Sequence, residues 1–112
     1  MSVSKALSVS PPAVDWTATA FTATSTAAVS LGFIAASATT IGQLHSEWFS
    51  FVADQDVHIV FGDANVAAAT TSRRRLFAGQ EYQWECTPSR ETHFRVIRNS
   101  ADGTLYWGRS GR

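Results

Sequence analysis

The sequence predicts an all-β fold, either a single β-sandwich or a jelly-roll-like barrel of about seven or eight short strands. Apolar and polar residues alternate with a period of two in several short runs, as in half-buried strands whose successive side chains point to opposite faces. Turn-forming residues interrupt these runs roughly every 8–12 residues, a spacing typical of sandwiches and barrels. No stretch has a sustained helical period, and 112 residues suffice for one hydrophobic core.

The chain begins with a segment that differs from the rest. Serine recurs through residues 1–13, which contain a single charged residue, Lys5, and the pair Pro11-Pro12. Proline has no N–H group and holds the preceding residue in an extended conformation. We therefore expect an extended arm over residues 1–13 and a β-sandwich domain over residues 14–112. The arm either contacts a partner's surface or sheet edge, or is a frayed terminus; its candidate contact residues are Val3, Leu7, Val9, Pro11 and Pro12.

Apolar alternation places the expected strands along the rest of the chain. They cover residues 15–21, 27–38, 48–51, 57–61, 66–70, 81–87, 93–98 and 104–107, of which 66–70 is the weakest. In the 57–61 strand His58 falls in the solvent-facing phase. Residues 71–75 are expected to form an exposed loop. Asp102-Gly103 is expected to supply the positive φ values of a hairpin turn.

Composition excludes several classes of function. Nine basic and nine acidic residues balance, so no overall field attracts the chain to nucleic acid or to an anionic membrane. The most apolar window, residues 27–38, is too short to span a bilayer, and the first residues do not read as a signal peptide. Cys86 is the only cysteine; it indicates a reducing compartment and is expected to be a buried structural residue.

The residues that carry catalytic chemistry are scattered. His45, His58 and His93 lack the close spacing of metal ligands. Glu81 and Glu85 lie on one face of a strand but about 13 Å apart, too far for paired acid–base work. Neither a nucleophile elbow nor a phosphate-binding glycine loop is present. We therefore expect a protein that is not an enzyme and that has no cofactor or metal.

Arg73, Arg74 and Arg75 form the one local cluster of charge. Arginine matches phosphate oxygens, which would indicate nucleic acid. The zero net charge and the absence of an accompanying aromatic motif disfavour that interpretation. An acidic patch on a partner protein, or a simply solvated loop, explains the cluster better. The three arginines are therefore candidate partner-binding residues.

The order of several short motifs resembles small structural proteins of tailed bacteriophages. The motifs are the strand ending in Phe61-Gly62, the Ala/Thr-rich residues 66–71, the Ala78-Gly79-Gln80-Glu81 turn, the strand with His93, and the final Gly103-Thr-Leu-Tyr. The resemblance covers roughly residues 25–111. The chain departs from it in the triple arginine and in Trp84 and Trp107, where smaller residues are usual.

This resemblance implies a β-sandwich subunit of the virion, without catalytic residues. The main expectation is a decoration or cement protein on the capsid surface that binds the major capsid protein and forms a homo-oligomer, possibly a trimer. An alternative place is the head–tail junction or the tail. A different class, a carbohydrate- or receptor-binding sandwich, would use Trp16, Trp48, Trp84 or Trp107 as stacking platforms and requires those side chains to be exposed.

Overall fold

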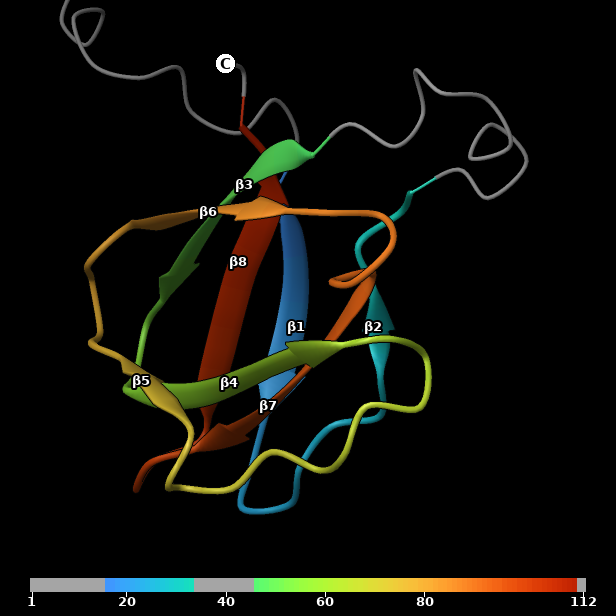
Figure 1. Ribbon diagram of the computed structural model, residues 1–112. Helices are drawn as coiled ribbons and strands as arrows, with labels where there is room; N and C mark the ends of the chain where they lie inside the picture. Colours follow the sequence, from blue (N-terminus) through green and yellow to red (C-terminus); the bar gives the residue numbers. More distant parts are fainter. Residues whose placement is uncertain (1–15, 34–45, 111–112) are drawn as a thin grey trace, which may run out of the picture.

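A computed structural model describes residues 16–33 and 46–110, which form two antiparallel sheets packed face to face (Figure 1). This confirms the all-β prediction, and the described residues contain no helix. The first sheet has the order β1 (Thr17–Phe21), β8 (Gly103–Arg109), β3 (Glu47–Ala53) and β6 (Tyr82–Cys86). The second has the order β2 (Val29–Ser30), β7 (His93–Arg98), β4 (Val57–Gly62) and β5 (Arg74–Leu76).

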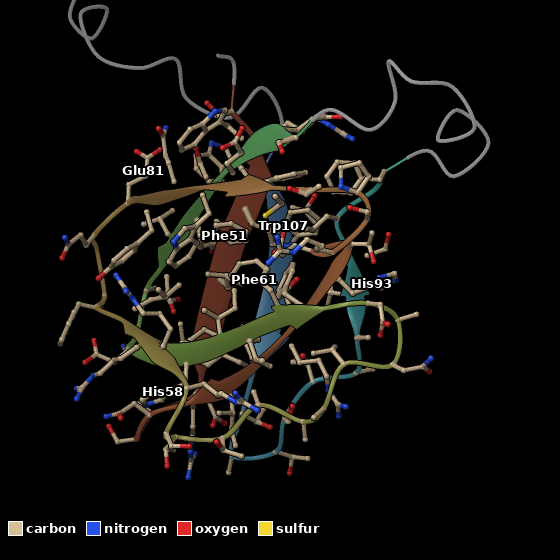
Figure 2. The ribbon with its side chains drawn as sticks, viewed as in Figure 1. Phe51, His58, Phe61, Glu81, His93 and Trp107 are labelled. Carbon is tan, nitrogen blue, oxygen red and sulfur yellow. The ribbon has the colours of Figure 1, made fainter. Side chains whose placement is uncertain are left out.

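The core lies between the sheets and is built from aromatic rings. Phe51 of β3 is fully buried and meets the edges of Phe61 and Phe94, on β4 and β7, at centroid distances of 5.7 and 5.8 Å. Trp84 of β6 lies 5.6 Å away, and Trp107 of β8 packs edge-on against Phe94 at 5.2 Å. Figure 2 shows Phe51, Phe61 and Trp107 pointing into the space between the sheets. Each such pair contributes about 0.5–1.5 kcal/mol beyond its buried area.

The prediction of a strand over residues 66–70 is wrong. This segment is a loop that crosses the outer face of the second sheet. The guanidinium of Arg95, on β7, donates to the carbonyl of Val66 at 3.0 Å and to that of Thr26 at 2.7 Å. The N–H of Ala69 donates to Ser25 Oγ at 2.9 Å, and Ala69 is buried. Side chains on β7 and in the connection after β1 therefore satisfy the loop's polar groups, and the loop does not join a sheet.

Two expectations about the neighbouring residues are also corrected. Residues 71–75 are not a loop throughout, because Arg74 begins β5, which pairs with β4 in the register His58↔Arg75. His58 does lie on the outer phase of β4, yet only 4% of it is exposed. Its Nδ1 donates to the carbonyl of Arg73 at 3.0 Å, and its Nε2 lies 2.9 Å from Asn99 Oδ1. The chain around it thus removes a polar outer-face residue from solvent.

The turn before β8 does not use positive φ values. Among the described residues only Gly32 and Gly79 have a positive φ. Gly103 is needed for space instead, because a Cβ there would come within 2.8 Å of Phe21 Cζ and 2.5 Å of Asp54 Oδ1. That same carboxylate oxygen accepts a hydrogen bond from the N–H of Thr104 at 2.7 Å. The absence of a side chain at Gly103 therefore allows the turn to approach β1 and β3 closely.

Gly103→Ala is expected to lower the free energy of unfolding by about 1–3 kcal/mol, the usual cost of overpacking a filled site. The measurement is urea unfolding followed by tryptophan fluorescence. The control is Ala101→Ser, two residues away in the exposed part of the turn, which should change stability by less than about 0.5 kcal/mol. Equal stability of both variants would contradict the close-approach explanation.

Candidate functional site

The ends of the described segments meet at one end of the sandwich, which we call the open pole (Figure 1). Phe33, after β2, packs edge-on against Phe49 at 5.6 Å. The N–H of Ser110 donates to the carbonyl of Trp48 at 2.8 Å, and Thr17 pairs with Trp107. The described segments 16–33 and 46–110 therefore both begin and end here. The candidate arm residues Val3, Leu7, Val9, Pro11 and Pro12 lie outside the described residues.

A pocket of about 430 Å³ opens at this pole. Leu31, Phe49 and Trp107 give it an apolar lining. The guanidinium of Arg109 lies over the Phe49 ring at 5.6 Å, donates to the carbonyl of Gly32 at 3.2 Å and pairs with Glu47. The open pole thus combines an apolar hollow with one neutralised charge pair at its rim.

Exposed aromatic side chains gather on the outer face of the first sheet. Trp16, Trp48 and Tyr106 are 42%, 37% and 41% exposed. Trp16 directly precedes β1, and the register Ala18↔Tyr106↔Val52 places the outward positions of three strands in one row. We call this surface the aromatic face; its members are Trp16, Ala18, Ala20, Trp48, Val52 and Tyr106.

The centre and border of the aromatic face have different chemistry. The register pair Ser50↔Gly108 puts two small residues between the rings. Along the β6 border, Gln83 Nε2 donates to Ser50 Oγ at 3.2 Å. Glu85 is opposite Trp48 and exposed, and it forms no hydrogen bond or ion pair with any residue that the structure describes. The centre of the face therefore has small, buried, uncharged residues, and its β6 edge is acidic.

The two outer faces of the sandwich are not equivalent. Loop residues 66–69 cross the second sheet and are held there by Arg95 and Ser25, and the connection after β1 runs along the edge of β7 and is hydrogen-bonded to it. Within residues 16–33 and 46–110, no corresponding segment crosses the first sheet. Of the four exposed large hydrophobic side chains in that part of the chain, only Phe77 lies elsewhere. An exposed apolar patch of this kind makes this face a candidate interaction surface.

The three candidate arginines do not act as one cluster. Arg75 binds Asp56 at 2.5 Å and lies over the Phe77 ring at 4.9 Å. Arg74 lies over the Trp84 ring at 5.7 Å. Only the Arg73 side chain makes no hydrogen bond, ion pair or ring contact with the described residues, although its carbonyl accepts from His58. Two of the three charges therefore have intramolecular roles, and binding of a partner through them remains a prediction.

The carboxylate of Asp56 holds the start of β4 to the turn before β6. Its Oδ1 accepts the N–H of Ala78 at 2.8 Å, and its Oδ2 accepts two bonds from Arg75. The Ala78 bond, followed by those from Arg75, lowers the pKa of this carboxyl below its ordinary value of 3.8. Asp56 thus adds side-chain bonds to the backbone pairing of β4 with β5 and neutralises one arginine.

The remaining reactive groups do not form a catalytic site in the part of the chain that the structure describes. Cys86 is 1% exposed, and burial, helped by Glu91, raises the pKa of its thiol to about 12; its predicted buried position is confirmed. His58 and His93 lie at opposite ends of the β4–β7 pair (Figure 2). No three His, Cys, Asp or Glu side chains among the described residues are placed to share a metal ion. His45 lies outside them.

A side pocket of about 340 Å³ opens between β4 and β6. Its lining mixes aromatic, acidic and basic side chains: Phe61, Arg74, Trp84, Glu85, Cys86 and Glu91. The guanidinium over Trp84 already occupies part of that ring's surface. Among the described residues there is also no helix long and apolar enough to cross a membrane.

Only two of the four tryptophans proposed as carbohydrate-stacking platforms are exposed. Trp107 is 7% exposed, and its Nε1 donates to Thr19 Oγ1 at 3.0 Å. Trp84 packs against the core and stacks on Tyr82, at 5.7 Å and 14°. That alternative therefore keeps only Trp16 and Trp48. Tyr106 was missed from the sequence, although its alternation with the inward-pointing Leu105 and Trp107 signals an outward position.

Comparison of the chain with models of protein families, with curated proteins and with solved structures finds no significant match. The resemblance to tailed-phage structural proteins therefore depends on the motifs in the sequence.

Asp56→Asn is expected to lower the urea midpoint of unfolding at pH 7, because an amide does not replace the charged acceptor of Ala78 and Arg75. A carboxyl whose folded pKa is lowered contributes stability above its unfolded value, and this contribution is lost as pH falls through the folded pKa. The difference between variant and wild type should therefore be constant above about pH 5 and shrink below about pH 4. Ser100→Ala, at an exposed turn residue, is the control, and a difference that persists unchanged at pH 2.5 would contradict the assignment.

Proposed function

We propose that this protein is an accessory structural protein of a tailed-phage virion, a decoration protein that docks on the assembled capsid shell. The observation that carries the proposal is the asymmetry of the sandwich. The aromatic face is bare of any described segment, and the open pole beside it is where the predicted arm joins the body. The opposite face is covered by the protein's own loop.

The chemistry of the aromatic face suits a protein partner. Tryptophan and tyrosine are enriched at the centres of protein interfaces, and charged residues are depleted there. The face combines three exposed rings with alanine and valine, and its nearest charges lie on the β6 border. Docking removes this apolar area from water without removing a buried charge from its counter-ion.

The arm and the polar end of the sandwich support the same orientation. An arm extends the contact area beyond the globular body, and many copies on one shell gain from avidity. The turn at the other end, between β7 and β8, is polar and exposed, and it is closed by the Arg98–Asp102 ion pair at 2.7 Å. The open pole and the aromatic face then meet the shell, and this turn faces solvent.

The primary test is co-sedimentation with capsids of the encoding phage from which accessory proteins have been stripped. The full chain should bind to saturation at a fixed copy number per capsomer, and a 14–112 truncation should fold but bind more weakly because it lacks the arm. Binding to unassembled capsid subunits as tightly as to shells would exclude a decoration protein. Binding to isolated tails or connectors in place of shells would move the protein to the head–tail junction.

A matched pair of substitutions tests which face docks. Ala18→Arg places a large cation on the aromatic face, and Ala101→Arg places the same group on the exposed turn between β7 and β8. Ala18→Arg should weaken binding to shells at least about tenfold, because its charge is desolvated in the interface. Ala101→Arg should have no effect, and equal behaviour of the two variants would remove the aromatic face from the proposal.

A further inference from the structure

The aromatic face has the form of a site for a proline-containing segment. Trp16 is two residues before Ala18, the register partner of Tyr106, so Trp16 and Tyr106 are diagonal neighbours with Cα atoms roughly 7–8 Å apart. Proline-rich segments bind in grooves between such rings, because the extended polyproline helix is already ordered before it docks. Ser50 and Gly108, between the rings, add no large side chain to this face, and their neighbours bury both of them.

The chain itself contains a segment of this chemistry outside the described residues. Pro11-Pro12 ends the arm, and the arm's apolar residues Val3, Leu7 and Val9 alternate with serine or other small or polar residues. We infer that the aromatic face binds the Pro11-Pro12 arm of a second copy of this chain, so that two or more copies are linked by their arms. This inference goes beyond the proposed docking on a capsid and does not require it. Where a neighbour's arm fills the aromatic face, the shell is met by the open pole and by the part of the face that the arm leaves uncovered.

Charge complementarity supports the same occupant. Lys5 is the only charged residue in residues 1–13, and Glu85, on the border of the aromatic face, has no ion-pair partner within the described part of the chain. From Lys5 to Pro11 a polyproline-like chain spans about 19 Å. Strand spacing and rise put Glu85 about 16 Å from Tyr106. With its prolines at Trp16 and Tyr106, a bound arm therefore brings Lys5 close to Glu85.

Chain direction favours the arm of a neighbour over the protein's own. Only Ala13, Val14 and Asp15 separate Pro12 from Trp16. The chain enters β1 at the open pole, so its own arm would have to reverse within those three residues to return over Tyr106. A neighbour's arm reaches the face without this turn, and reciprocal exchange gives a symmetric assembly.

The first measurement is sedimentation equilibrium of the full chain and of the 14–112 truncation, without capsids. The full chain should associate in a concentration-dependent way, and the truncation should be monomeric. A synthetic peptide of residues 1–13 should then bind the truncation and change its tryptophan fluorescence. A peptide with Pro11 and Pro12 both replaced by alanine should bind about tenfold more weakly.

Substitutions on the face distinguish this site from others. Tyr106→Ala in the truncation should weaken peptide binding about tenfold. Phe77→Ala, which removes the exposed ring that lies off the aromatic face, should leave it unchanged. Glu85→Lys and a Lys5→Glu peptide should each weaken binding by about two- to fivefold, the range of an exposed ion pair. Combining the two should restore the affinity, which a merely structural role of Glu85 would not do.

Three results would overturn the inference. A truncation that does not bind the peptide excludes the arm as occupant. A full chain that stays monomeric and ignores added peptide, while the truncation binds it, shows that the protein's own arm covers the face. Binding of a neutral oligosaccharide that Tyr106→Ala abolishes, with no response to the peptide, assigns the face to a glycan. A failure of capsid binding would leave this inference intact, and a monomer that still binds shells would leave the proposed function intact.

Discussion

The packing of aromatic rings between the two sheets is the interaction on which the rest of the structure depends. Phe51 stands at its centre, in contact with rings from both sheets. The strands are short, and β2 has two residues and β5 three, so ladder hydrogen bonds alone hold these elements weakly. Each large ring that packs between the sheets buries more apolar area than a smaller side chain would, which matters in a small domain. These rings also fix which side of the strands that carry them faces outward.

The two sheets pack through their inner faces, and their outer faces differ in whether a loop of the protein covers them. On the second sheet, Arg95 and His58 give hydrogen bonds to the carbonyls of a crossing loop, which leaves that face covered. The first sheet carries small, apolar and aromatic residues at the corresponding positions, and no arginine or histidine within the described strands points there to bind a loop. Side chains that can hold the protein's own backbone thus determine which face is left for other molecules.

The features by which the sequence departs from the expected phage pattern have roles within the fold. Trp107 and Trp84 belong to the inter-sheet packing, and two of the three consecutive arginines are held by Asp56 and by an aromatic ring. These departures therefore reflect the way the sandwich is stabilised. What remains for a partner is the combination of the aromatic face, the open pole and the arm. This combination is the basis for the proposed role in a larger assembly.

The sequence by itself determined the fold class and most of the strands. Alternation as clear as that of Val57, Ile59 and Phe61 follows from a local property, the two-residue repeat of an extended chain. The sequence also predicted the burial of Cys86, which the structure confirms. Only the tertiary structure decided the outer faces, because the burial of His58, the path of residues 66–70 and the space around Gly103 depend on segments distant in sequence. The grouping of Trp16, Trp48 and Tyr106 is of the same kind, since it results from the order β1-β8-β3 in the sheet, and strand order is set by long-range packing that no local pattern encodes.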